Sequence, residues 1–347
     1  MTGDDQPIGE EMDEALEILA PFGPSFRGGL SNHGPMTIEA LVSLGQADLV
    51  VPWATKYRRR LEKRATAHRK ITATTWQAAL GDGARNRDWD EWFANELREA
   101  PWRDVVGTWV PRLAPGIAAA GLHGVIRVGH AVCSLRIKEN DARLDELARA
   151  LSYWATEYLT LPGKPKGIGK LAPSRALQKV TPLPEELRKS RGLITTELKD
   201  LVGFQPFEEV INLVDPSSGS PSFLEDLLAT FAGTFVNTRS GSFEFLHAIT
   251  GSAAVAELAP LVKEKQRADV LAFTWQVTAS VFARYSRNNL TATVDTTGKL
   301  PSTEQLAKSA IARGDEHTIK LVAACTREWR RNPDARILAA ANRRANR

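Results

Sequence analysis

Residues 267–285 read RADVLAFTWQVTASVFARY, and the spacing of their side chains decides the fold class. After an adjacent first pair, intervals of three and four residues separate the members of one largely apolar stripe, as on one face of an α-helix. The stripe consists of Val270, Leu271, Trp275, Thr278 and Phe282. The same period recurs outward along the chain, at residues 11–20, 57–70, 89–99, 123–135, 141–158, 185–202, 223–235, 242–261, 303–313 and 315–330. We find no convincing run of alternating strand residues, so the sequence predicts an all-α protein.

Composition places the chain among soluble globular proteins. Its 347 residues are 43% hydrophobic and 25% charged, which excludes disordered, collagen-like and disulfide-stapled classes. Two cysteines, Cys133 and Cys325, are too few for a disulfide framework and indicate a reducing, cytoplasmic location. The acidic N-terminus does not resemble a signal peptide. The most apolar window, residues 243–262, contains Glu244, His247 and Glu257, so we expect a buried core helix and no membrane span.

We predict one large multi-helix domain over residues 1–347, interrupted by a long loop. Residues 161–184 are rich in Gly, Pro and Lys, which is typical of an exposed loop or lid. This segment is not a phosphate-binding P-loop, because Lys164 stands where that motif needs glycine and Leu171 where it needs a hydroxyl. No GxGxxG segment follows a strand either, which excludes a recognisable dinucleotide-binding fold.

The histidines are the most informative polar residues. The chain has six, and His68 lies in a basic run where we expect it to be solvated. The other five occupy apolar or turn-rich settings, namely His33, His123, His130, His247 and His317. His123 and His130 are seven residues apart, so two helical turns place them on one face, about 10.5 Å apart along the axis. A single ion reaches both only if it lies between those turns.

Five buried imidazoles favour a shared metal site in the helical core. Burying each one costs free energy unless it finds a partner, and one metal ion satisfies several together. A set of imidazoles without cysteine suits iron, copper, nickel or zinc. The alternative for each histidine alone is a hydrogen-bonded core residue.

Three further residues could assist such a site. Glu244 shares a helix face with His247 and is the best candidate for an acidic helper. Arg127 lies between the two histidines of its helix and could steady an oxyanion, or form a surface salt bridge instead. Lys320 could bind a cation only as a neutral amine or as a carbamate. Its alternative is a surface lysine paired with Glu316 or Glu328.

Four blocks together resemble the questin oxidase family, in order and spacing across nearly the whole chain. The blocks are Ser31-Asn32-His33-Gly34-Pro35-Met36, His123-Gly124-Val125-Ile126-Arg127-Val128-Gly129-His130-Ala131, Leu246-His247-Ala248-Ile249-Thr250-Gly251 and Asp315-Glu316-His317-Thr318-Ile319-Lys320. The resemblance implies oxidative C–C cleavage of an anthraquinone-like aromatic polyketide by O₂, of Baeyer–Villiger or dioxygenase type, at a non-haem Fe(II) centre.

The resemblance also implies the ligand set of that centre. On this analogy the ligand candidates are His33, His123, His130, His247 and His317, together with a carboxylated Lys320. Four imidazoles and a carbamate nearly fill an octahedron, so one of the five histidines is expected outside it. NADPH is not an expected cofactor, because no binding fingerprint occurs. A hydroquinone substrate or a partner reductase would supply the electrons.

Two rival functions remain open from the sequence. The first is a metal-independent oxygenase that uses a histidine as general base. The second is a helical binding protein that holds an acidic partner with the basic residues Lys56, Arg58, Arg59, Arg60, Lys63 and Arg64. Those charges spread around a predicted helix instead of forming one stripe, so we expect a solvated face and no nucleic-acid partner.

Overall fold

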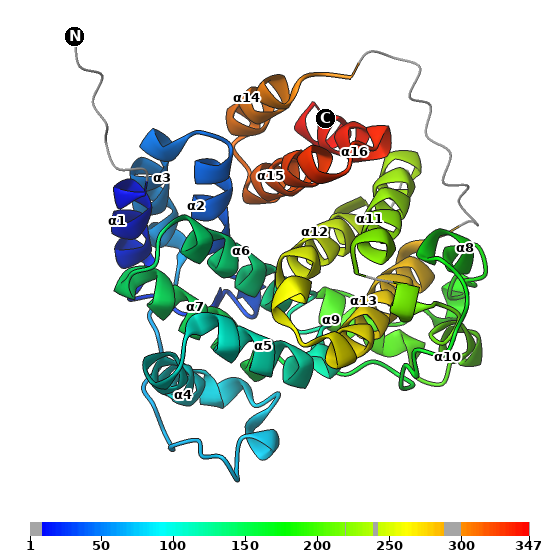
Figure 1. Cartoon of the computed structure of the whole chain (residues 1–347), viewed down its shortest axis with the longest axis horizontal. Helices are drawn as coiled ribbons and strands as arrows, with labels where there is room; N and C mark the ends of the chain where they lie inside the picture. The colour runs from blue at the N-terminus through cyan, green and yellow to red at the C-terminus, as the bar shows by residue number, and fades with distance from the viewer. Residues whose placement is uncertain (1–8, 219, 239–241, 288–299, 347) are drawn as a thin grey trace.

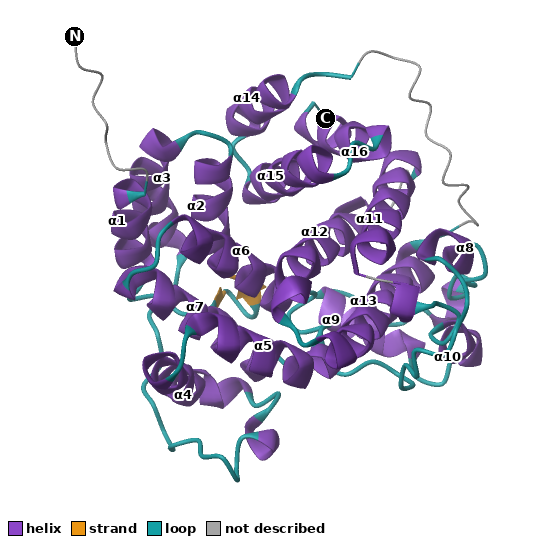
Figure 2. Cartoon of the chain, viewed as in Figure 1, coloured by secondary structure: helices purple, strands orange, loops and turns teal. Residues whose placement is uncertain are grey.

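Helices make up nearly all of the regular structure in the computed structural model (Figure 1, Figure 2). The structure describes residues 9–218, 220–238, 242–287 and 300–346. The rest of the predicted domain, residues 1–8, 219, 239–241, 288–299 and 347, lies outside the described residues. The all-α prediction is confirmed. Among the described residues the only β-strands are β1 (Ser25–Phe26) and β2 (Leu30–Ser31), which form one short hairpin.

The described α-helices follow one another along the whole chain. In the N-terminal half they are α1 (Glu10–Leu19), α2 (Gly34–Ser43), α3 (Val50–Tyr57), α4 (Asn86–Glu99), α5 (Trp102–Leu113), α6 (His123–Ile137), α7 (Asp141–Thr156) and α8 (Pro173–Leu177). In the C-terminal half they are α9 (Ile194–Glu197), α10 (Gln205–Val210), α11 (Ser220–Asn237), α12 (Ser242–Leu258), α13 (Glu264–Tyr285), α14 (Thr303–Arg313), α15 (Glu316–Arg331) and α16 (Ala335–Ala345).

The two halves of the chain share one hydrophobic core. A single cluster of buried side chains includes residues from Met36 near the N-terminus to Ala345 near the C-terminus. A smaller cluster joins α1, α2 and α3 to Ile319 and Ala323 of α15. Five tryptophans, including Trp109 and Trp275, are fully buried and belong to the larger cluster.

Four helices pack around the centre of the molecule: α2, α6, α12 and α15 (Figure 1). The helix α6 contacts both α2 and α12, while α15 contacts α2 and α12 from the other side. Gly129 allows the close approach of α6 and α12, since a Cβ there would lie 2.9 Å from the Cα of Ala254. Gly124 likewise lies against Trp154 of α7.

Two sequence predictions about elements are wrong, and one helix was not predicted. The basic helix expected over residues 57–70 is wrong, because α3 ends at Tyr57 and the chain beyond Arg60 is irregular. Residues 185–202 form short helical pieces instead of one helix. The closing helix α16 was not expected, although it is amphipathic and buries one face that consists mostly of alanine.

The central loop is irregular and packed against its neighbours. Residues 161–184 contain only the short helix α8, and Leu171 pairs with Val214 in an isolated bridge. Gly163 and Gly169 lie directly against Ile211 and Leu213. These contacts attach the segment to the region around α10 and α11.

Candidate metal centre

Four imidazoles converge where four helices begin. His33 is the N-cap of α2, His123 is the first residue of α6, and His317 lies in the first turn of α15. His247 lies in the second turn of α12. Because each side chain comes from a different helix, the packing of α2, α6, α12 and α15 brings together residues from position 33 to position 317.

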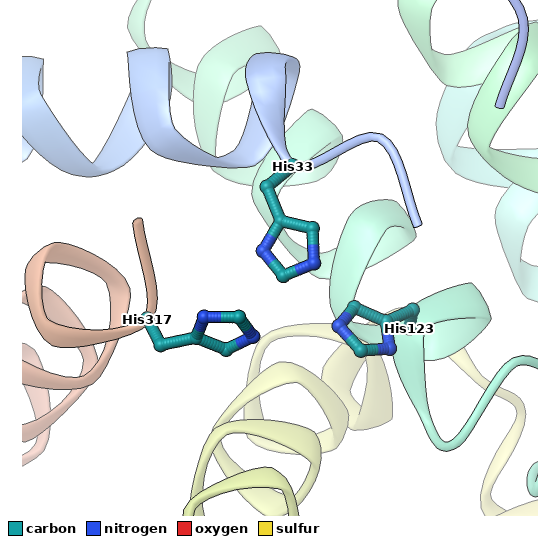
Figure 3. A group of neighbouring side chains, drawn as sticks. All are labelled: His33, His123 and His317. Carbon is teal, nitrogen blue, oxygen red and sulfur yellow. The ribbon is translucent and has the colours of Figure 1, made fainter. Parts of the chain in front are cut away.

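The first three histidines form a compact group (Figure 3). One ring nitrogen from each of His33, His123 and His317 lies within 4.8 Å of the other two. The fourth ring is adjacent, with the centroid of His247 lying 4.7 Å from that of His123 and 5.5 Å from that of His317. Nitrogens at this spacing could hold a metal ion between them.

Each of the four rings has a buried nitrogen without a hydrogen-bond partner among the described residues. These atoms are Nδ1 of His33, Nε2 of His123, Nε2 of His247 and Nε2 of His317. Buried polar atoms are nearly always paired, because an unpaired one keeps its full desolvation cost. Four such atoms in one cluster therefore require a common explanation.

Backbone carbonyls orient two of the rings. The Nδ1 of His123 lies 2.6 Å from the carbonyl oxygen of Ala120, and the Nδ1 of His247 lies 2.8 Å from that of Phe243. A carbonyl only accepts, so both Nδ1 atoms carry the proton and, in the neutral ring, each Nε2 carries a lone pair. This arrangement is typical of histidines that bind a metal through Nε2.

The backbone before α6 is strained where it supplies one of these carbonyls. Ala120 and Leu122 both have positive φ, 48° and 71°, on either side of Gly121. Residues other than glycine pay of order 1–3 kcal/mol for such a conformation, and it persists mainly where the surroundings impose it. The strain turns the Ala120 carbonyl toward His123.

Burial keeps the imidazoles neutral. It is the largest cause lowering the pKa of all four histidines, and the charge of Lys320 contributes at each. The pKa of His247 falls to about 3. At neutral pH the rings therefore present lone pairs and do not repel a cation.

Lys320 is buried beside the cluster, so the surface-lysine alternative is wrong. It is 1% exposed, and burial lowers its pKa to about 7. The two candidate carboxylate partners of this lysine form other ion pairs, Glu316 with Arg60 and Glu328 with Arg331. A substantial fraction of this amine is neutral at physiological pH.

His130 lies outside the cluster. Its Nδ1 donates to Oε2 of Glu39 at 2.5 Å, and Glu39 also accepts from Arg327 at 2.7 Å. The seven-residue separation from His123 places His130 two turns further along α6. Of the five candidate histidines, this is the one that the structure keeps apart from the other four.

Two other candidates occupy different environments. Arg127 forms a buried bidentate ion pair with Glu146 of α7, at 2.7 and 2.8 Å. Its guanidinium therefore contacts this carboxylate, which does not fit the predicted contact with an oxyanion. Its salt bridge is buried, not at the surface. Glu244 lines a separate cavity of about 220 Å³ with Arg284 and Tyr285, and burial raises its pKa.

Sequence reasoning did not single out Phe243. Its ring centroid lies 4.8 Å from that of His247 and 4.6 Å from that of His317. The residue is nevertheless 41% exposed, so it stands between the cluster and solvent. Its position four residues before His247 was the available signal, since that spacing puts both on one helix face.

Comparisons with known proteins do not assign this chain to a family. No family model and no curated protein matches this chain. Among the described residues, no helix is long and apolar enough to cross a membrane.

Proposed function

We propose that the chain is a non-haem iron oxygenase whose metal is held by His33, His123, His247 and His317. The observation that carries this proposal is the convergence of four buried, unpartnered imidazole nitrogens in one cluster. Neutral imidazoles suit first-row transition metals, and the resemblance of the four sequence blocks to questin oxidases favours iron among them. His130 is assigned outside the ligand set.

Lys320 is the proposed fifth ligand, as a carbamate. A neutral amine attacks CO₂ through its lone pair, forming an N–C bond and releasing a proton. The resulting carbamate offers oxygen atoms and a negative charge. His33, His123 and His317 lie at the N-termini of α2, α6 and α15, and helix N-termini stabilise negative charge.

The proposed substrates are O₂ and an anthraquinone-like aromatic polyketide. A bound ferrous ion would supply the redox chemistry that makes dioxygen reactive toward such a ring. Phe243 offers an aromatic surface at the solvent edge, beside His247 and His317, where a flat ring could stack. The polyketide, a possible reductase and a cytoplasmic location remain predictions from the sequence.

The first test is metal content, measured by mass spectrometry on untagged protein. Wild type is reconstituted with ferrous iron under anaerobic conditions and compared with His247→Ala. The matched control is His68→Ala, because that histidine is exposed. We expect one iron per chain in wild type and in the control, and a large loss in His247→Ala.

Oxygen uptake then tests the reaction. The iron-loaded protein should accelerate O₂ consumption when the hydroquinone form of an anthraquinone such as emodin is added, since that form supplies its own electrons, and the His247→Ala variant should not. Wild type that binds no iron contradicts the proposal. If such metal-free protein still consumed O₂ with emodin, the function would be cofactor-independent oxygenation with a histidine base.

A further inference from the structure

A second buried polar group lies further along the same four helices. We call it the lower network, and its members are Glu39 of α2, His130 of α6, Glu257 of α12 and Arg327 of α15. Each ligand-bearing helix thus contributes one member. His130 follows His123 by seven residues and Arg327 follows Lys320 by seven, which puts them about 10.5 Å further along the same helix faces.

Ionic contacts connect the members directly. Glu39 accepts from His130 at 2.5 Å through Oε2 and from Arg327 at 2.7 Å through Oε1. The Nε of Arg327 lies 3.8 Å from Oε1 of Glu257. Arg136 and Arg331 complete the surroundings of Glu257 from the solvent side. The chain of contacts therefore runs from α6 through α2 and α15 to α12.

Because this network is buried, its charged groups must stay in close contact with their partners. Glu39 and Glu257 are each 1% exposed. Burial alone would raise the pKa of Glu39, but Arg327 and His130 outweigh it and hold that pKa below its usual value. A buried ion pair adds little stability over well-packed apolar residues, yet it fixes the relative position of the groups that form it. A metal site needs that kind of fixed geometry.

We propose that the lower network positions the four ligand-bearing helices, with Glu39 and His130 as positioning residues for the metal centre. This inference rests on the proposed function. Glu39 contacts side chains from two other helices at once, so it sets how α2 is placed relative to α6 and α15. Those three helices carry the three histidines of the compact group.

The matched experiment compares two buried carboxylates. Glu39→Gln removes a charge inside the lower network, while Glu146→Gln removes one from the pair with Arg127, which joins α6 to α7. Glu146 is 4% exposed, and α7 carries no ligand. Cobalt(II) chloride is titrated into wild type and both variants, with affinity from the binding isotherm and coordination from the visible d–d absorption.

We expect Glu39→Gln to bind cobalt roughly 10- to 100-fold more weakly, with an altered d–d spectrum. Glu146→Gln should keep the affinity and spectrum of wild type, although both variants melt at lower temperature. A purely structural role predicts similar changes in cobalt binding for the two variants, and that result would overturn the inference.

A second pair of variants covers the case in which Glu39→Gln does not fold. His130→Gln keeps a side-chain donor toward Glu39, whereas His130→Leu removes it. Positioning predicts near wild-type cobalt affinity in the first and a loss in the second. Equal affinities in both overturn the inference, and so does wild type that binds no cobalt, which overturns the proposed metal centre as well.

Discussion

Lys320 is the residue whose chemistry depends most on its surroundings. Buried among neutral imidazoles, its amine has a pKa of about 7 and can react with CO₂. We predict that protein equilibrated with ¹³C-bicarbonate shows a carbamate carbon signal by NMR. Lys320→Met keeps the volume and removes the amine, so the signal should vanish. An unchanged signal in this variant would place the carbamate elsewhere.

Glu328 gives the chain a specific pH dependence. Burial is the largest cause raising its pKa, to about 7, and the nearby Glu257 adds to it. The folded state therefore holds this proton more tightly than the unfolded state does. The contribution of Glu328 to the free energy of unfolding is greatest below the unfolded pKa near 4.5. It falls by about 2–3 kcal/mol as pH rises toward 7.

The variant Glu328→Gln should remove this part of the pH dependence. Because glutamine cannot ionise, we expect its free energy of unfolding to fall less between pH 5 and pH 8 than that of wild type. Urea denaturation at the two pH values measures the difference. Glu91→Gln, at an exposed position, is the control and should fall as wild type does. Identical falls in all three proteins would contradict the prediction.

At the scale of elements, helix packing around α6 depends on its glycines. Gly124 and Gly129 both lie where a neighbouring helix approaches closely. A Cβ at position 129 would meet the Cβ and Cα of Ala254 at 2.7 and 2.9 Å. Since a backbone atom cannot yield like a flexible side chain, α6 and α12 would have to separate.

We therefore predict that Gly129→Ala destabilises the fold by about 1–3 kcal/mol, despite the better helix propensity of alanine. Gly83→Ala is the matched control, because no atom lies within 4 Å of its added Cβ. Its change should stay within about 0.5 kcal/mol. Urea denaturation measures both. Equal stability of the two variants would show that α6 and α12 adjust freely.

Two long, largely apolar helices were predictable from sequence, whereas the structure of the segment after Tyr57 was not. The helices α12 and α13 follow the predicted bounds closely. Beyond Tyr57, however, the predicted basic helix lacks a continuous apolar face, so no packing offsets the cost of ordering it. Asp88 instead accepts hydrogen bonds from the backbone of His68 and Arg69 and holds this stretch in an irregular conformation.

At the scale of the whole molecule, some residues of the site can be recognised from the sequence. The roles of others follow only from how the helices pack. Apolar or turn-rich surroundings were enough to select His33, His123, His247 and His317 as a group. They could not separate His130, because its partner Glu39 lies 91 residues away in the chain. The same holds for Arg127, whose partner Glu146 belongs to the next helix.

A metal held by four helices from distant parts of the sequence should stabilise the entire fold. An ion that binds the folded chain and not the unfolded one adds about 2.7 kcal/mol when present at 100 times its dissociation constant. For a chain of 347 residues we expect a rise in melting temperature of roughly 3–5 °C with Co(II) or Fe(II). Mg²⁺, which prefers oxygen ligands, should give no rise. Differential scanning calorimetry should find the same rise in His68→Ala and none in a His123→Ala/His317→Ala double variant, because only the latter lacks two of the three nitrogens of the compact group. A rise that survived in the double variant would place the ion outside this cluster.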